Sequence, residues 1–412
     1  MPIFNFPTKK NISILALGAE SAGNFSVFNK GKIYFSEDFG DLLEEKNWKK
    51  FQSAVLKYLK DNKIKPEIIL TDLHPLFKTT LWGKELAKKY GAKHIPVQHH
   101  ISHTFSSVGD SFLKTPGVLS FRHRVSKTFY GIALDGTGFG TDEKIWGGEV
   151  FKGKMSARQK GLSVERIGHL ENQIMIGGDL AIKEPARMLI SILNKFLSKK
   201  EIYSFVKKYY TQNEFELIYN QLAQNFNCLE TSSAGRVLDA VSILLGFCGN
   251  ARKYKHEPID KLEKNSTKPY TDLRPKIDNN CELQITYLFN YLINYLHKRD
   301  RKRLAATAQL YIAQGLYKII ELARHPDPPT GGEGSAYKNL KLNNCRKTKS
   351  ITKQILHSTS LVQNDDVFIS GGLTNNKIIS SFLESKGAYI NKKIPRGDAG
   401  ISFGQLVYYL SS

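Results

Sequence analysis

The chain has 412 residues, 41% of them hydrophobic and 24% charged, and its 60 basic residues against 38 acidic ones give a net charge of +22. This composition is that of a globular protein long enough for about two to three domains, which excludes collagen-like, disordered and disulfide-scaffold proteins. No run of 18 apolar residues is present and the four cysteines form no Cys-x-x-Cys pair, so we expect a cytoplasmic protein with reduced thiols, no signal peptide and no membrane partner.

Residues 1–128 predict an N-terminal lobe, a mixed sheet with helices packed outside it. Apolar runs and alternation indicate the strands, and apolar residues at helical spacing indicate the helices. The expected order is βββαβαβ, with a strand over 12–17, a hairpin of strands 25–29 and 31–35, a helix over 48–60, a strand over 66–72, a helix over 80–90 and a strand over 93–97.

Residues 129–412 predict a C-terminal lobe of similar strand and glycine-turn units. In chain order we expect a strand over 130–134, a glycine-rich hairpin turn over 136–142, a strand over 146–151, a mostly helical insertion over about 180–325, a loop over 325–350, and a strand over 366–370 that leads through Gly371-Gly372 into a helix. The fold class is therefore α/β, with a helical insertion in the second lobe.

The net charge of +22 attracts polyanions but does not by itself identify a nucleic-acid-binding protein. The lysines are spread from Lys9 to Lys393, and only short clusters occur, at 298–303 and 346–349. We favour solvated faces or a generic phosphate-attracting surface over a dedicated nucleic-acid site.

Three histidines stand within five residues directly after the strand that ends at Val97. His99 and His103 are four residues apart, so on a helix their imidazoles lie on one side and can share a metal; His100 lies between them. A chance cluster on a surface helix is the simpler alternative, and we favour the metal site. Asp135 and Asp398 are candidates for the remaining ligands, because each follows a strand or lies in a glycine turn.

Glycine-rich turns follow two buried strands. Gly136-Thr137-Gly138 and Gly371-Gly372 allow backbone N–H groups to approach a phosphate, although plain turns carry similar glycines. Asp72 and His74 stand at the end of a core strand, where active-site groups of open α/β sheets gather.

Three further residues lie near predicted helix starts, and each has a structural alternative. Lys183 and Arg187 could meet phosphates, beside an Asp179 that could cap its helix. Asp239 either compensates a helix dipole or binds sugar hydroxyls.

Taken together, these segments resemble the C-terminal carbamoyltransferase domain of the hydrogenase maturation factor HypF, a member of the actin-like ATPase superfamily. The matching segments follow the family's order over nearly the whole chain: Leu17-Gly18-Ala19-Glu20, Asp72-Leu73-His74-Pro75, Val97 to His103, Ala133 to Gly140, Trp146-Gly147-Gly148-Glu149, Gly177-Gly178-Asp179, Lys183 to Met188, Ser233 to Asp239, Ser370-Gly371-Gly372, and Gly397 to Gln405.

The resemblance implies two ribonuclease-H-like lobes around a nucleotide and metal cleft. It implies a divalent metal, Zn or Fe, on His99, His103, Asp398 and Asp135. The nucleotide, ATP or carbamoyl-adenylate, would contact Gly136-Thr137-Gly138, Asp239 and Gly371-Gly372. The implied activity is transfer of a carbamoyl group from carbamoyl-adenylate to the C-terminal cysteine of a HypE-like partner, on the way to the cyanide ligands of nickel-iron hydrogenase. Catalytic roles are expected for Asp72, His74 and His100.

The sequence departs from the family pattern in places. Complete HypF proteins carry three domains before this one, and here the match begins near Ile12. We therefore expect that a separate protein supplies carbamoyl-adenylate, the alternative being that this chain has lost that chemistry. Ser21-Ala22-Gly23-Asn24 replaces a leucine-lysine-asparagine run, and the segment 254–258 replaces a Tyr-Glu-Gly pattern. A tRNA threonylcarbamoyltransferase, a small-molecule O-carbamoyltransferase and a non-catalytic nucleotide-binding scaffold remain alternatives, and tRNA a less favoured partner.

Overall fold

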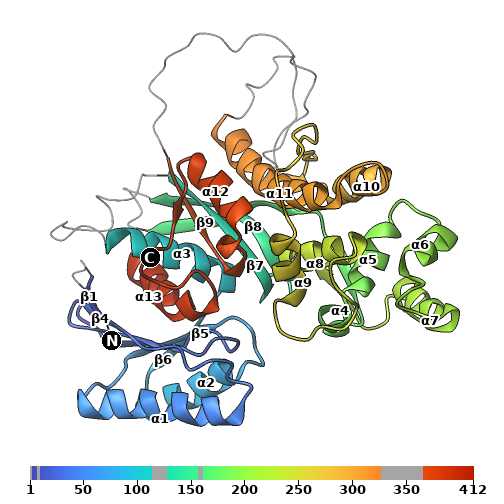
Figure 1. Ribbon diagram of the computed structural model, residues 1–412. Coiled ribbons are helices and arrows are strands. Elements are labelled where there is room, and N and C mark those ends of the chain that lie inside the picture. Colours follow the sequence, from blue (N-terminus) through green and yellow to red (C-terminus); the bar gives the residue numbers. More distant parts are fainter. Residues whose placement is uncertain (1, 7–9, 114–127, 156–160, 326–364) are drawn as a thin grey trace, which may run out of the picture.

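Two β-sheets organise the chain in the computed structural model, which describes residues 2–6, 10–113, 128–155, 161–325 and 365–412 (Figure 1). The first sheet has the order β1-β4-β3-β2-β5-β6. Its strands are β1 (Ile3–Asn5), β2 (Ile14–Ala16), β3 (Ser26–Asn29), β4 (Lys32–Phe35), β5 (Ile68–Asp72) and β6 (Lys93–Val97). The expected mixed sheet is confirmed, because β2, β5 and β6 are parallel and the hairpin strands antiparallel. The prediction missed β1, whose three residues are too few to show a periodic pattern.

Helices cover both faces of the first sheet. α1 (Glu45–Asp61) and α2 (Lys78–Tyr90) pack on one face, where Leu15 and Val27 meet Phe51. α3 (His99–Phe112) and α13 (Ile401–Ser411) pack on the other and lie between the two sheets (Figure 1).

The end of the chain therefore returns to the first sheet. A Cβ on Gly404 would lie 1.9 Å from the Ser102 carbonyl oxygen, so a side chain there is incompatible with the close approach of α13 and α3. Gln405 Oε1 accepts from the Gly18 N–H at 3.1 Å. These contacts place the residues just before α13 beside the start of α3.

The second sheet has the order β10-β11-β8-β7-β13-β14, with β9 joined to β8 and β12 to β9. Its strands are β7 (Thr128–Phe139), β8 (Ile145–Met155), β9 (Leu162–Leu170), β10 (Gln173–Ile176), β11 (Cys228–Thr231), β12 (Glu282–Leu283), β13 (Asp366–Ser370) and β14 (Tyr389–Ile390). The prediction of a turn over 136–142 is wrong for its first residues, which belong to β7. β7 continues to Phe139 and pairs with β8 again at Gly138 and Phe139, after a register shift that begins at Leu134. The chain reverses only after Phe139.

Helices fill most of the described part of the chain between β10 and β13. They are α4 (Leu180–Lys183), α5 (Ala186–Leu193), α6 (Lys199–Val206), α7 (Gln212–Ala223), α8 (Ala234–Leu244), α9 (Glu257–Lys264), α10 (Ile285–Tyr295) and α11 (Arg301–Arg324). They share one large apolar core with the second sheet. The helix expected after Gly371-Gly372 is first a 3-10 turn, η2 (Gly372–Asn375), and α12 (Lys377–Ser385) follows Asn376. All but the first residue of the loop predicted at 325–350 lies outside the described residues.

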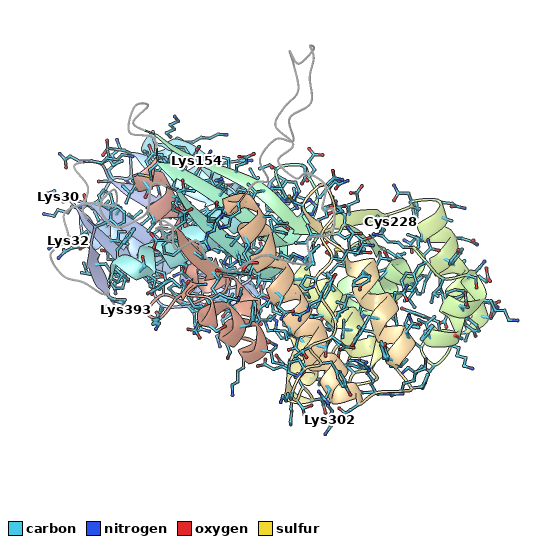
Figure 2. All side chains as sticks on the ribbon, turned by 90° about the horizontal axis from the view of Figure 1, so that it is seen from above. Lys30, Lys32, Lys154, Cys228, Lys302 and Lys393 are labelled. Atoms are coloured by element: carbon cyan, nitrogen blue, oxygen red, sulfur yellow. The ribbon has the colours of Figure 1, made fainter. Side chains whose placement is uncertain are left out.

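Three expectations from composition can be compared with the structure. Figure 2 shows Lys30 and Lys32 far from Lys302, in line with a spread rather than a concentrated charge. Among the helices of the described ranges, none combines the length and apolar character needed to cross a bilayer. Cys228 is a free thiol, as is Cys248, but Cys281 is disulfide-bonded, so the expectation of reduced thiols is wrong at that position.

Candidate active site

The two predicted histidine ligands lie on the first turns of α3. β6 ends at Val97 and α3 begins two residues later, with Gln98 as its N-cap residue accepting a hydrogen bond from the Ile101 N–H at 2.8 Å. The spacing of four residues brings His99 and His103 to the same side of the helix, with ring centroids 4.8 Å apart. The start of the helix thus fixes both rings at the carboxyl end of a parallel strand.

Two carboxylates from distant segments meet these histidines. Asp135 comes from β7, and Asp398 opens the 3-10 turn η3 (Asp398–Gly400) just before α13. One ligand atom from each of the four residues lies within 4.8 Å of all the others. His99 Nε2 is 3.4 Å from Asp135 Oδ2 and 3.6 Å from Asp398 Oδ1, while the corresponding distances from His103 Nε2 are 3.7 and 3.4 Å.

This arrangement fits a divalent metal. Donors about 2.1 Å from a tetrahedral ion lie about 3.4 Å from one another, close to the distances seen here. The Nε2 atoms of His99 and His103 are buried and find no hydrogen-bond partner among the described residues. Two imidazoles and two carboxylates suit Zn or Fe equally. The structure therefore brings together the four residues that the sequence predicted as ligands.

Outer contacts orient three of these four side chains, those of His99, Asp135 and Asp398. Asp72, at the end of β5, accepts a hydrogen bond from His99 Nδ1 at 2.7 Å, which leaves the lone pair of Nε2 directed at the cluster. The Gly372 N–H contacts Asp135 Oδ1 at 3.4 Å, and the Ser21 hydroxyl donates to Asp398 Oδ2. Sequence reasoning missed Ser21, which has no metal-ligand signature.

The electrostatics of the cluster follow from burial and opposite charge. Burial alone would lower the pKa of His99, but Asp72, Asp135 and Asp398 hold it well above its ordinary value. The pKa of His103 is raised by the same two cluster carboxylates against burial. Burial opposes ionisation of Asp135, yet its histidine neighbours keep its pKa well below the usual range. In the absence of a metal, protons on the histidines balance the carboxylates.

His100 differs from its two neighbours. It is fully buried, and burial together with the charge of His99 lowers its pKa well below the ordinary value. Gln98 Nε2 contacts His100 Nδ1 at 3.1 Å, while Gln98 Oε1 is already used by the Ile101 N–H. Nδ1 is therefore an acceptor, and the neutral ring carries its proton on Nε2, which has no partner among the described residues.

The predicted glycine segments lie against this cluster. A Cβ on Gly138 would be 2.5 Å from His100 Cε1 and 2.6 Å from His99 Cδ2, so the backbone of β7 touches both rings. Gly371 has a φ of +106° and lies so close to Leu134 that a Cβ would be 2.1 Å from its carbonyl oxygen. These glycines let the ends of β7 and β13 approach each other beside Asp135.

Asp239 lies on α8 between two arginines that sequence reasoning did not single out as ligand-binding residues. Arg236 Nη2 is 2.9 Å from Asp239 Oδ2, and Arg252 Nη2 contacts the same oxygen. Asp239 Oδ1 is buried and unpartnered in the described part of the chain. Arg236 stood within a segment already noted for Asp239, whereas no sequence pattern marked Arg252.

The remaining predicted residues lie farther out. His74 is half-buried, stacks on Phe77 with ring centroids 4.1 Å apart, and has a pKa lowered by burial. Arg187 donates from Nε to Glu184 at 2.7 Å, and Lys183 is exposed at the end of α4. Asp179 precedes α4 but forms no side-chain cap. No contact of the described residues joins Lys183 or Arg187 to the metal-ligand cluster.

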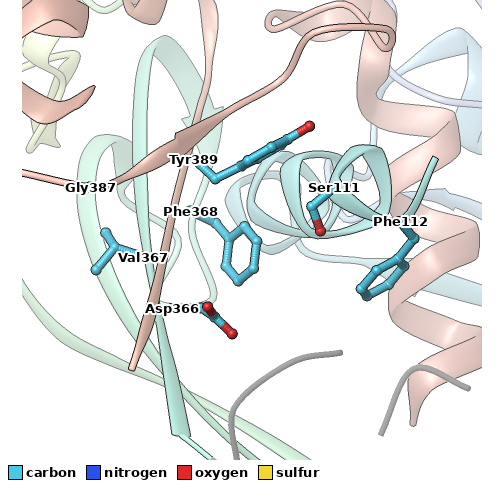
Figure 3. A pocket seen from close by; sticks show the side chains of 7 residues that line it. All are labelled: Ser111, Phe112, Asp366, Val367, Phe368, Gly387 and Tyr389. Atoms are coloured by element: carbon cyan, nitrogen blue, oxygen red, sulfur yellow. The ribbon is translucent and has the colours of Figure 1, made fainter. Parts of the chain in front are cut away.

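A pocket of about 430 Å³ lies elsewhere (Figure 3). It is lined by the C-terminal end of α3 together with β13 and the segment at β14, including Phe112, Phe368 and Tyr389. At a rise of about 1.5 Å per residue, Phe112 is about 20 Å along α3 from His99. The pocket contains none of the predicted site residues and is separate from the candidate active site.

The chain is similar to several carbamoyltransferases. The chain is similar to the probable carbamoyltransferase HypF of Methanocaldococcus jannaschii, with 33% identity over 98% of this chain and 48% of that protein. It is also similar to the carbamoyltransferase HypF2 of Cupriavidus necator, with 30% identity over 57% of this chain and 26% of the relative. The chain spans about half the length of the archaeal relative.

Solved structures show the same fold. The crystal structure of T. kodakarensis HypF matches 99% of this chain and 48% of its own with a TM-score of 0.78 and 26% identity. A full-length HypF in a phosphate- and nucleotide-bound form matches 99% of this chain and 56% of its own, with a TM-score of 0.78 and 24% identity. The two lobes with actin-like ATPase folds are thereby confirmed.

Two family models match successive parts of the chain. The HypF Kae1-like domain matches residues 9–110, and the second subdomain of the carbamoyltransferase Kae1-like domain matches residues 131–329. Their order and the archaeal relative's near-complete coverage of the chain agree with the resemblance noted in the sequence. The chain belongs to the family of HypF Kae1-like carbamoyltransferase domains.

Proposed function

We propose that this chain transfers a carbamoyl group from carbamoyl-adenylate to the C-terminal cysteine thiol of a HypE-like partner in nickel-iron hydrogenase maturation. The observation that carries the proposal is the buried cluster of His99, His103, Asp135 and Asp398, in which both histidine Nε2 atoms lack a hydrogen-bond partner among the described residues. The names of its relatives supply the reaction class.

In this proposal a divalent metal is held by the four residues of the cluster. When bound, Zn or Fe would supply a Lewis acid beside the phosphate and carbonyl oxygens of the donor. Asp72 acts through His99. Its Oδ2 accepts a hydrogen bond from His99 Nδ1–H, with 2.7 Å between the two atoms, and this favours the neutral tautomer that presents a lone pair at Nε2. Asp72 is thus a positioning residue rather than a proton carrier.

His100 is suited to stabilise an oxyanion. Its lowered pKa keeps the ring neutral, and its Nε2–H donor is buried beside Gly138. As the partner's thiolate attacks the carbamoyl carbon, the carbonyl oxygen gains negative charge. The neutral imidazole of His100 can stabilise this oxyanion by donating a hydrogen bond from Nε2–H.

The reaction needs no nucleophile from this chain. A C–S bond forms to the partner's cysteine, the C–O bond to the adenylate phosphate breaks, AMP leaves, and the thiol proton passes to solvent or to His74 at the outer edge of the site. The Gly136–Gly138 and Gly371-Gly372 segments allow a phosphate to approach the backbone. Asp239 Oδ1, which is buried and lacks a partner among the described residues, suits a ribose hydroxyl.

The direct test is carbamoyl transfer followed by intact mass spectrometry. Purified chain with measured metal content is incubated with carbamoyl-adenylate and a HypE-like protein, and the mass of the partner is recorded. We expect one carbamoyl adduct on the terminal cysteine, absent from a partner with Cys→Ser at that position. H99A and H103A should lose both metal and adduct. His297, an exposed histidine on another surface, provides the matched control H297A.

Failure to form the adduct with metal and nucleotide bound would refute the proposed acceptor. In that case tRNA and small-molecule hydroxyl groups are the next acceptors to supply under the same conditions. Transfer to none of the three would leave a nucleotide-binding scaffold as the function.

A further inference from the structure

A cluster of cations surrounds a single acid, Asp239, in the middle of α8. Asp239 Oδ2 receives guanidinium N–H groups from both Arg236 and Arg252. The side chain of Arg236 is 6% exposed and that of Arg252 is 9% exposed. Lys255 extends the cluster, because Arg252 Nη1 donates to the Lys255 carbonyl oxygen at 2.6 Å. Two buried guanidinium groups therefore face one carboxylate oxygen, and the backbone of Lys255 adjoins them.

The cluster contains more buried donors than acceptors. Arg236 Nε and Nη1 and Arg252 Nε find no hydrogen-bond partner within the described ranges. Buried guanidinium groups are normally paired, because an unpaired buried charge is costly. Burial correspondingly lowers the pKa of Arg236 and raises that of Asp239. The free donors and the excess charge both favour an added oxyanion.

This cluster adjoins the metal-ligand cluster. The Ser233 hydroxyl, at the N-cap of α8, donates to the Gly136 carbonyl oxygen. A Cβ on Gly235 would lie 2.9 Å from Gly136 Cα, so the first turn of α8 packs directly against the residues that follow Asp135. An anion on Arg236 would consequently lie next to the predicted phosphate-binding glycines.

Lys255 joins the two lobes at this place. Its Nζ atom lies 3.4 Å from the carbonyl oxygen of Ser21 in the first lobe, and the Ser21 side chain in turn contacts the predicted metal ligand Asp398. Lys255 is exposed, so its weak contact with a neutral carbonyl can be exchanged for an ion pair at little cost.

We propose that Arg236, Arg252 and Lys255 form an oxyanion site that receives a phosphate group of the nucleotide bound beside the metal-ligand cluster. This inference rests on the proposed function for the identity of the nucleotide. It places phosphate recognition on α8 and the segment that precedes α9, instead of on Lys183 and Arg187. Asp239 is the internal counter-ion that holds the two guanidinium groups together.

The test compares ligands that differ only in phosphate. Isothermal titration calorimetry with the full chain, its metal content measured, gives the affinities for AMP, adenosine and inorganic phosphate. We expect AMP to bind at least about tenfold more tightly than adenosine, since one charge-assisted contact contributes about that factor. R252Q and K255Q should each reduce the preference for AMP over adenosine several-fold, and K255Q, which removes no partner of Asp239, should leave adenosine binding unchanged. K253Q, a change at an exposed lysine two residues away, is the matched control.

Equal binding of AMP and adenosine by the wild-type chain, or an undiminished preference in K255Q, would overturn the site. K255Q decides the matter if R252Q does not fold, because Lys255 is exposed. Carbamoyl transfer without a phosphate preference refutes this inference alone, whereas a phosphate preference without transfer refutes only the proposed function.

Discussion

Adding one methyl group at Gly138 should displace the rings of His99 and His100 and so weaken metal binding. Gly138 lies on β7, and a Cβ there would be 2.5 Å from His100 Cε1 and 2.6 Å from His99 Cδ2. Carbon atoms in contact lie about 3.5–4.0 Å apart, so both rings must move by about 1 Å. At Gly136, two residues earlier on the same strand, the nearest atom to a Cβ is Arg236 Nη2 at 3.9 Å. G136A is therefore a matched control.

The expected magnitudes follow from these distances. Overpacking of a buried site typically costs about 1–3 kcal/mol, so G138A should lower the free energy of unfolding by about that amount. A displaced His99 can no longer keep both its 2.7 Å contact with Asp72 and its place beside Asp135. Loss of such orienting contacts reduces metal affinity about 10- to 100-fold. G136A should change both quantities little.

The assay is competition for Zn²⁺ against a chelator of known affinity, with urea unfolding of the metal-free protein measured in parallel. A G138A protein that binds zinc as tightly as wild type and G136A would refute the assignment of His99 to the metal site. Equal loss of affinity in both variants would instead indicate a general effect of side chains on this strand.

Three further predictions test the surroundings of the cluster. D72N places an amide N–H against His99 Nδ1, which favours the tautomer with its proton on Nε2; zinc affinity should fall about 10- to 100-fold while far-ultraviolet circular dichroism stays unchanged. In the metal-free protein, burial lowers the pKa of His99, but Asp72 and Asp135 raise it well above 6.5, so the charge of His99 stabilises the fold below that pH. Urea unfolding should show this stability lost as pH rises through the raised pKa. H99Q should show a smaller loss, namely the part that His103 contributes. R166A should lower the free energy of unfolding by about 3–5 kcal/mol, because Glu149 is fully buried and accepts a hydrogen bond from Arg166 Nε at 2.5 Å. R166K keeps the charge and should lose less free energy of unfolding in the same urea titration. Equal stability of R166A and wild type would contradict the pairing.

Spacing and strand ends determined the histidine part of the site. The separation of four positions from His99 to His103 places both rings on one side of a helix, whatever the helix packs against. The strand that ends at Val97 and the one that ends at Asp72 are parallel neighbours, so their carboxyl ends meet at one edge. These are local or nearest-neighbour relations, and residue order alone specifies them.

Other features were only partly determined by the sequence. The glycines at 136–138 were expected to reverse the chain, but the structure shows that they extend β7, because its hydrogen bonds with β8 resume at Gly138. A glycine-rich segment permits both outcomes, and pairing with a neighbouring strand decides between them. In the same way, the choice between helix-dipole compensation and sugar binding for Asp239 could not be made from the sequence, which does not show its arginine partners.

The convergence of Asp398 and Ser21 with the histidines is a product of tertiary structure. Asp398 is almost 300 residues from His103, and it reaches the cluster because α13 packs on α3 at Gly404 and returns the end of the chain to the first sheet. Arg252 and Lys255 likewise reach Asp239 and Ser21 through a loop without a periodic pattern. The sequence by itself determined the local geometry of the ligands and, through its ordered motifs, the family. Only long-range packing decided which distant side chains complete the site, because sequence separation carries no information about contact between elements that the core brings together.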